Sequence, residues 1–324
     1  MLRRPERAGR VSGVGKLATG AAVDAALVGR KEGESMPEGT RKLLKPLGCE
    51  LTHGLIEQTQ KHLADAVQSP QSAPAVLRDL AYGPHERHRL DIFVREGTHD
   101  APVVVFVHGG GYVMGDKRLP GLPFYDNVGN WAADAGFVGV TINYRLAPDH
   151  MWPCGADDVA QAVAWVRANI ALHGGDPRRI FLMGQSAGAV HVAGYLSRPD
   201  AGAQVSGAVL VSGAYDLGQV SPTAYALAYY GTDRTRYESF STINGLVKTA
   251  VPLCVVVAEF DGIDFRRQAA LLVGAYGRAR GDIPRIHWLA GHNHLSTVLA
   301  IGTPYDALGP VVREFVHATT PDLG

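Results

Sequence analysis

Gly184-Gln185-Ser186-Ala187-Gly188 is the most informative segment of the chain. It follows an apolar run at 180–183 that predicts a strand, and it opens a pattern that predicts a helix. Glycine on both sides keeps a sharp strand-to-helix turn free of side-chain clashes. Such a turn lifts a serine hydroxyl above the carboxyl edge of a sheet. The stretch therefore predicts Ser186 as a nucleophile, against the alternative of an ordinary glycine/serine turn.

Strand and helix signals alternate on both sides of this turn. Strands are expected at 76–82, 90–94, 103–107, 138–143, 180–183, 207–211, 253–258 and 285–289. Helices are expected at 124–135, 156–173, from 186, 266–278 and 308–317. This alternation, led by a hairpin, predicts an α/β fold with a mostly parallel, eight-stranded sheet and helices on both faces.

The ends of the chain and one internal stretch depart from the alternation. Residues 1–35 are basic and rich in glycine and alanine, and we expect them to form a disordered tail. Residues 36–324 are expected to form one domain. Leucines at helical spacing from 40 to 67, broken or kinked at Pro46, and an irregular stretch after 214 predict a small helical cap from about 36–70 and 215–249.

Composition bounds the partners. Lys+Arg and Asp+Glu both number 31, so nothing indicates nucleic acid or an anionic membrane, and no apolar run reaches the roughly 18 residues of a membrane span. Cys49, Cys154 and Cys254 show neither a disulfide framework nor a zinc spacing. We expect buried free thiols, which favour a reducing, cytoplasmic setting. His85 and His88 fall in the hairpin turn, where solvent exposure explains them better than a metal site.

A second glycine-rich stretch supports the nucleophile. His108-Gly109-Gly110-Gly111-Tyr112 closes the valine-rich run at 103–107. Successive glycines let the backbone approach a ligand and present N–H groups to it, as an oxyanion hole requires. We expect the N–H groups of Gly110, Gly111 and Ala187 to serve as donors. A phosphate-binding loop is the alternative, but neither of its glycine patterns is present.

A general base and an orienting acid should follow the serine along the chain. Asp261 comes just after the strand at 253–258, and His294 just after the strand at 285–289, so both fall at the edge that carries Ser186. His294 is expected to take the serine proton, and Asp261 to orient the imidazole. Asp264 and Glu259 are alternatives for the acid, and His292 is the alternative for the base.

With these residues in place, the chain resembles the hormone-sensitive-lipase-like branch of the α/β hydrolases, from about residue 76 to the end. The stretches that carry the resemblance are 108–112 (HGGGY), 143–148 (NYRLAP), 150–153 (HMWP), 174–177 (GGDP) and 184–188 (GQSAG). The resemblance implies carboxylester hydrolysis through an acyl-enzyme without a cofactor. It also implies the triad Ser186, Asp261 and His294.

Some stretches depart from that branch. Asp261 is followed by Gly-Ile-Asp instead of Pro-Leu and a later Asp, and the cap is short. Residues 82–85, 90–93, 115–117 and 213–217 are similar to the arylformamidase-like group, although its His-Gly-Gly-Tyr-Trp loop is missing. Formamide hydrolysis, as of N-formylkynurenine, is therefore an alternative to ester hydrolysis.

The sequence thus predicts a serine hydrolase that acts on small esters of short to medium acyl chains, with an amide as the alternative substrate and no metal or cofactor. A non-catalytic hydrolase-like binding protein is the remaining alternative. Tyr112 and the insertion tyrosines Tyr225, Tyr229 and Tyr230 are candidates for substrate contact, while packing of the insertion onto the core explains the latter three equally well. The sequence leaves the oligomeric state open, and a homodimer is compatible with it.

Overall fold

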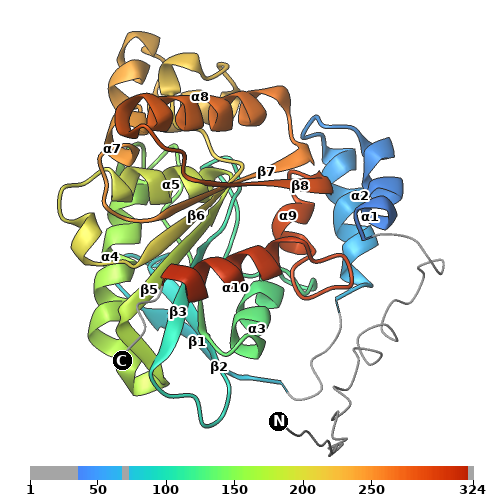
Figure 1. The fold of residues 1–324 in the computed structure, drawn as a ribbon, viewed down its shortest axis with the longest axis vertical. Coiled ribbons are helices and arrows are strands. Elements are labelled where there is room, and N and C mark those ends of the chain that lie inside the picture. The colour runs from blue at the N-terminus through green and yellow to red at the C-terminus, as the bar shows by residue number, and fades with distance from the viewer. Residues whose placement is uncertain (1–35, 68–72, 320–324) are drawn as a thin grey trace, which may run out of the picture. The chain divides into compact units, whose positions relative to one another are not determined.

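The computed structural model describes residues 36–67 and 73–319, so the tail expected over 1–35 lies outside the described residues. The described residues form an eight-stranded sheet, in which the strands are arranged in the order β1-β2-β4-β3-β5-β6-β7-β8 (Figure 1). The strands are β1 (Ala75–Ala81), β2 (Arg89–Val94), β3 (Ala101–Val107), β4 (Val138–Ile142), β5 (Gly175–Gln185), β6 (Gly207–Val211), β7 (Leu253–Phe260) and β8 (Arg285–Asn293). The pairs β1–β2 and β2–β4 are antiparallel, and all other pairs are parallel.

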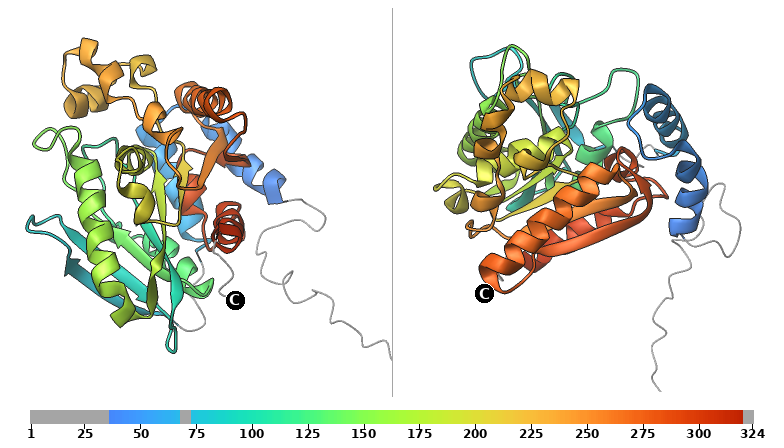
Figure 2. Two further views of the ribbon diagram at one scale, coloured as in Figure 1. Left: turned by 60° about the vertical axis from the view of Figure 1, so that its left-hand side comes forward. Right: turned by 90° about the horizontal axis from the view of Figure 1, so that it is seen from above.

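Helices cover both faces of the sheet, as Figures 1 and 2 show. The α-helices are α1 (Met36–Leu44), α2 (His53–Ala64), α3 (Asp126–Asp134), α4 (Cys154–Asn169), α5 (Ala187–Leu196), α6 (Ala224–Tyr230), α7 (Ile243–Leu246), α8 (Ile263–Arg280), α9 (Ser296–Leu299) and α10 (Leu308–Thr319). One core cluster joins α4, α5 and α8 to the sheet, and a second joins α3 and α10 to its other face. The predicted α/β fold is confirmed. None of the described helices is long and apolar enough to cross a membrane.

Two helical segments stand outside the β–α alternation. The N-terminal pair, α1 and α2, is separated by a short 3-10 turn at Lys45–Leu47, where Pro46 ends the first helix. Helix α1 lies beside β8 (Figure 2). The second segment, between β6 and β7, contains α6 and α7. Helix α6 packs in a mainly aromatic cluster together with Ala147 and Val190, whereas Leu246 of α7 belongs to the core cluster on the sheet.

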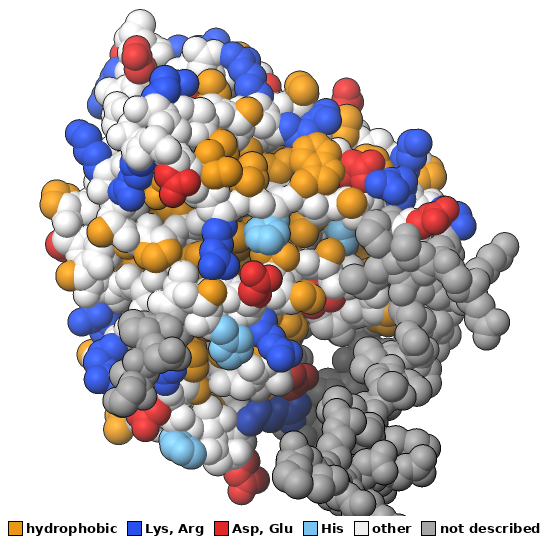
Figure 3. All heavy atoms as spheres, in the orientation of Figure 1, with side chains coloured by type: hydrophobic (Ala, Val, Ile, Leu, Met, Phe, Trp, Pro, Cys, Tyr) orange, Lys and Arg blue, Asp and Glu red, His pale blue; other side chains and the backbone are white. Residues whose placement is uncertain are grey.

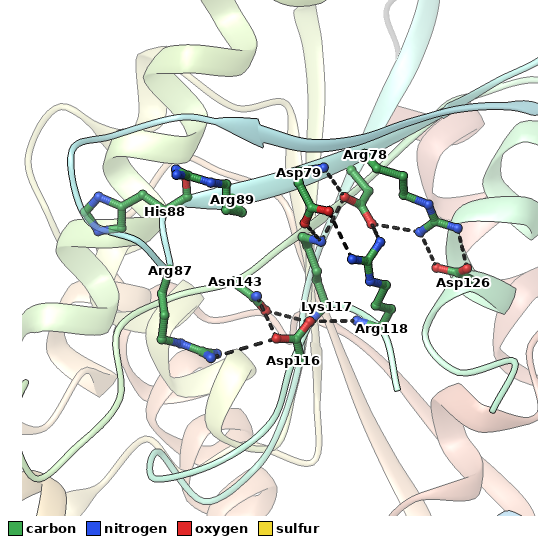
Figure 4. Close-up of polar contacts among 11 residues, drawn as sticks. Arg78, Asp79, Arg87, His88, Arg89, Asp116, Lys117, Arg118, Asp126 and Asn143 are labelled. Carbon is green, nitrogen blue, oxygen red and sulfur yellow. Dashed lines mark hydrogen bonds and ion pairs between the residues drawn. The ribbon is translucent and has the colours of Figure 1, made fainter. Parts of the chain in front are cut away.

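A buried ion-pair network fastens the hairpin β1–β2 to the loop after β3 (Figure 4). Lys117 is 1% exposed, and its Nζ lies 2.6 Å from Asp79 Oδ1 and 2.9 Å from Asp91 Oδ1. Arg78 bonds Asp91 at 2.7 Å. Buried charges are tolerated when they are paired and hydrogen-bonded in this way. The network therefore fixes the loop that follows the three glycines.

The same loop is held from a second side. Arg87, in the hairpin turn, donates to the carbonyl of Gly115 at 2.9 Å and to the carbonyl of Tyr144 at 2.7 Å. Asn143 donates to Asp116 at 2.9 Å and accepts the backbone N–H of Lys117 at 2.6 Å. The hairpin, which carries no predicted site residue, thus supports the backbone next to the site.

Two expectations about individual residues are wrong. His88 is not solvated: it is 2% exposed, and its Nε2 lies 3.1 Å from Asp158 Oδ1. Asp158 also binds Arg145, so the turn is closed over a polar cluster that local sequence cannot indicate. All three cysteines are free, but Cys49 is exposed and only Cys254 is buried.

Strand β8 is an edge strand with hydrophobic side chains on its outer surface. Ile286 and Trp288 are 46% and 55% exposed, and Figure 3 shows hydrophobic side chains gathered over α8 and β8. Surfaces of this kind favour association with another protein. The homodimer considered from the sequence stays a prediction.

Candidate active site

The predicted nucleophile lies at a strained turn between β5 and α5. Ser186 has φ 55° and ψ −120°, a conformation that residues with a side chain rarely adopt, and it is 9% exposed. A Cβ at Gly188 would lie 2.0 Å from the carbonyl oxygen of Val107, and one at Gly184 would lie 2.5 Å from that of Gly188. Only glycine fits on either side of the serine, so the motif is explained by packing of the turn.

The glycine loop after β3 lies against this turn. Gly110 and Gly111 have φ 131° and 58°, and a Cβ at Gly110 would lie 2.0 Å from the carbonyl oxygen of Met114. The position of a Cβ at Gly109 is 3.2 Å from the Cβ of Ser186. The backbone of the loop can therefore lie this close to the serine only because the glycines have no side chains.

His108 anchors the start of the loop. Its side chain is completely buried, and its Nδ1 donates to the carbonyl of Gly109 at 2.6 Å. The ring stacks on Tyr144 with centroids 4.4 Å apart. Burial lowers the pKa of His108 to about 4, so the ring is neutral near pH 7. It is a structural support for the glycines.

The predicted base and acid form a close pair. His294 Nδ1 lies 2.7 Å from Asp261 Oδ1, and the two side chains are 2% and 0% exposed. A carboxylate oxygen accepts hydrogen bonds, so Nδ1 is the donor of this pair, and a neutral imidazole then has its lone pair on Nε2. That Nε2 has no hydrogen-bond partner among the described residues. The pair therefore has the arrangement of an oriented general base.

Two alternatives for the acid and base, Glu259 and His292, are engaged elsewhere. His292 Nδ1 lies 3.1 Å from Ser296 Oγ, and burial lowers the pKa of His292 to about 4. Glu259 accepts from Arg41 at 2.7 Å and from the N–H of Gly291 at 2.7 Å. Asp264 lies partly buried in the first turn of α8. The geometry thus favours Asp261 and His294.

Three further residues touch this arrangement and were missed from the sequence. Gln185, 1% exposed, donates to the carbonyl of His294 at 3.0 Å. Phe265 stacks on the imidazole of His294 with centroids 4.2 Å apart. Ser212 donates to Asp261 Oδ2 at 2.6 Å. Only Ser212 carried a usable signal, since it comes directly after the strand predicted at 207–211.

The N-terminal helices reach the base from outside. Asn293, which precedes His294, donates from Nδ2 to Thr59 Oγ1 of α2 at 2.8 Å, and both side chains are fully buried. Asn293 Oδ1 in turn accepts the N–H of Ser296 at 2.9 Å. The loop that carries the base is therefore fixed by a residue near the start of the described chain.

The candidate substrate tyrosines fall into two groups. Tyr225 is 48% exposed, and its ring lies 3.0 Å from where a Cβ of Gly111 would be. Tyr229 and Tyr230 are 1% and 5% exposed, and Tyr112 stacks on Tyr229 with centroids 4.4 Å apart. Burial of Tyr229 and Tyr230 favours the packing alternative for them. Tyr225 remains the tyrosine of the insertion that faces the glycine loop.

Metal chemistry was not expected from the sequence. Within 36–67 and 73–319, no three His, Cys, Asp or Glu side chains are grouped so that they could hold a metal ion.

A parallel sheet of this order, with a serine turn after β5 and an acid and histidine after β7 and β8, is the architecture of the α/β hydrolases. The chain belongs to that family: residues 104–271 match the family model described as alpha/beta hydrolase fold. The matched range contains Ser186 and Asp261.

Curated relatives match parts of the chain. Esterase LipQ of Mycobacterium tuberculosis is 33% identical over 200 residues, which are 57% of this chain and 46% of that protein. The probable isoprenylcysteine alpha-carbonyl methylesterase ICMEL1 of Oryza sativa is 40% identical over 119 residues, 36% of this chain and 27% of its own length. The match thus spans about a quarter to a half of these relatives.

Among solved structures, the hyperthermophilic esterase from Pyrobaculum calidifontis superposes with a TM-score of 0.66 and 22% identity, over 86% of this chain and 96% of that chain. This likeness bears on the fold. The relatives named here are esterases, and the arylformamidase-like features noted in the sequence find no support among them.

Proposed function

We propose that this protein is a serine carboxylesterase that hydrolyses small carboxylic esters through an acyl-enzyme. The observation that carries the proposal is the His294–Asp261 pair at 2.7 Å, whose Nε2 has no partner in the part of the chain that the structure describes. The pair lies beside the strand end that presents Ser186, because Gln185 donates to the carbonyl of His294 at 3.0 Å. The esterase relatives support the ester as the substrate class.

In the first half of the reaction, Ser186 Oγ attacks the ester carbonyl while His294 Nε2 takes the hydroxyl proton. Asp261 holds the ring and stabilises the imidazolium that forms. The carbonyl oxygen becomes an oxyanion, which the N–H groups of Gly110, Gly111 and Ala187 would stabilise. His294 then returns the proton to the leaving alcohol, and the acyl group stays on Ser186.

In the second half, water replaces the alcohol. His294 takes a proton from the water as its oxygen attacks the acyl carbonyl, and the proton is returned to Ser186 Oγ when the acid leaves. All groups that move protons in this scheme belong to the chain itself.

The small size of the cap supports acyl chains of short to medium length. The segment between β6 and β7 forms only short helices, of which α6 is seven residues long. Its exposed Tyr225 lies over Gly111, where it would contact the acyl or alcohol part of a substrate. We therefore propose esters of short to medium acyl chains as the preferred substrates.

The test compares p-nitrophenyl acetate, butyrate, octanoate and palmitate with wild-type protein and Ser186→Ala. We expect turnover of the shorter esters and a loss of about 10⁴- to 10⁶-fold in the variant. Ser206→Ala is the matched control. Ser206 lies just before β6, at the end of the strand far from Ser186, and its hydroxyl donates to the carbonyl of Arg178. Wild-type protein that hydrolyses no ester, or Ser186→Ala that keeps its activity, contradicts the proposal.

A further inference from the structure

Like Ser186, Ser212 is a non-glycine residue that directly follows a strand of the sheet and has a positive φ. It follows β6, has φ 51° and is 1% exposed. Glycine adopts this conformation without the steric cost that a Cβ brings. A serine held there is therefore strained, and strain of this kind persists where the surrounding structure requires the side chain.

The hydroxyl of Ser212 has a defined partner. Its Oγ donates to Asp261 Oδ2 at 2.6 Å, within the range of hydrogen bonds to charged oxygens. The N–H of Ala258 donates to the same oxygen at 2.8 Å. Two donors on Oδ2 leave Oδ1 for the imidazole of His294. A carboxylate that is 0% exposed needs such donors to satisfy its buried oxygens, and they hold it in one orientation.

The residue before Ser212 supports the nucleophile. The carbonyl of Val211 accepts the N–H of Ser186 at 2.9 Å, and the N–H of Ser212 donates to the carbonyl of Val256 in β7 at 2.9 Å. Two adjacent residues at the end of β6 thus hold the backbone of the serine and the carboxylate of the acid.

We infer that Ser212 is a positioning residue of the hydrolytic site: its hydroxyl fixes the rotation of the Asp261 carboxylate, and through it the orientation of His294. The inference rests on the triad proposed above. This role explains why a serine occupies position 212, where glycine would adopt the positive φ without steric cost.

The test distinguishes this role from a structural one with two variants of Ser212. One removes the hydroxyl together with the backbone strain, and the other keeps a hydroxyl while it increases the strain. Ser212→Gly removes both the strain and the hydroxyl, so we expect an unchanged or higher Tm with a kcat lower by about 10- to 100-fold. Ser212→Thr keeps a hydroxyl and adds a branched Cβ, so we expect a lower Tm with kcat within about 3-fold of wild type. KM should change by less than about 3-fold in both. If Ser212 were only structural, kcat would fall in the variant whose Tm falls and would stay unchanged in the variant whose Tm does not.

Asp100→Gly is the matched control for strain. Asp100 has φ 45° and lies just before β3, at the opposite edge of the sheet. We expect it to leave kcat unchanged. Active-site titration with a fluorophosphonate gives the fraction of folded enzyme, so that kcat refers to competent molecules.

A second measurement places the effect on Asp261. In an Asp261→Ala background, Ser212→Ala should cost no further activity, because the group through which it acts is gone. A further loss of 10-fold or more there overturns the inference, as does Ser212→Gly with kcat within 3-fold of wild type. Ser186→Ala and wild type run beside these variants: if wild type is inactive or Ser186→Ala is active, the proposed function itself has failed.

Discussion

Arg41 of α1 donates two hydrogen bonds to Glu259, and the same carboxylate accepts the N–H of Gly291. Glu259 precedes Asp261 by two residues, and Gly291 precedes His294 by three. The Arg41 guanidinium holds the pKa of Glu259 below its usual range. Glu259 therefore links the first helix to the two loops that carry the acid and the base.

From this contact we predict different outcomes for the neighbouring carboxylates. Glu259→Gln keeps the size of the side chain and removes only its charge, so kcat should fall by less than about 10-fold. Asp261→Asn removes the partner of the imidazole, so kcat should fall by about 10³- to 10⁴-fold. Steady-state kinetics on p-nitrophenyl butyrate measures both. The reverse order would assign the acid to Glu259.

The histidines of the base loop allow a similar comparison. His294→Gln should lower kcat by at least about 10³-fold, because no other group takes the serine proton. His292→Gln should keep kcat within about 10-fold, since Nδ1 of His292 is engaged with Ser296 Oγ, whereas the imidazole of His294 binds Asp261. It should instead lower the Tm. Loss of turnover in His292→Gln alone would show that the base is misassigned.

The insertion tyrosines separate binding from folding. Tyr225→Ala should raise KM for p-nitrophenyl butyrate by about 3- to 10-fold with little change in stability, because the ring is half exposed over Gly111. Tyr229→Ala should lower the free energy of unfolding by about 3–5 kcal/mol, because it empties a buried aromatic site. Urea unfolding and activity assays on the two variants test this prediction. Equal effects of Tyr225→Ala and Tyr229→Ala on KM would contradict the assignment of Tyr225 to binding and of Tyr229 to packing.

Buried neutral histidines predict sensitivity to acid. Burial lowers the pKa of His191 to about 3 and those of His108 and His292 to about 4. In the unfolded chain these histidines bind protons near pH 6.5. Their contribution to the free energy of unfolding is therefore fully present above that pH and is lost as the pH falls toward 4. Each such residue removes about 2 kcal/mol of unfolding free energy between pH 7 and pH 5.

His191→Gln tests this directly, because it removes one buried titrating ring on α5. We expect its unfolding free energy, measured in urea at pH 7, 6 and 5, to fall less steeply than that of the wild type. Parallel slopes would mean that His191 takes up no proton on unfolding in this range.

The fold could be predicted because its buried parallel strands read as continuous apolar runs with helices between them. β6, Gly207–Val211, has the predicted bounds. β8 extends four residues beyond its predicted end because Ala290–Asn293, with a glycine and polar side chains, does not read as a strand on its own. Pairing with β7, where Phe260 is opposite Asn293, carries it further.

The positions of the proposed acid and base could be predicted from strand ends, but the residues that support them could not. Gln185 and Ser212 act through contacts with residues 109 and 49 positions away. His88 reads as a turn residue until Asp158, 70 positions later, is brought against it. Such contacts depend on the tertiary arrangement, which local pattern does not encode.

The bond between Thr59 and Asn293 joins residues 234 positions apart in the chain. Contacts of such long sequence separation form late in folding, because a large loop must close before they contribute. Because Ser186 precedes His294 in the chain, the segment of the serine turn is synthesised before the segment of the proposed base. Hydrolytic competence would then appear only once early-synthesised and late-synthesised segments have met, so that turnover serves as an assay for completed folding.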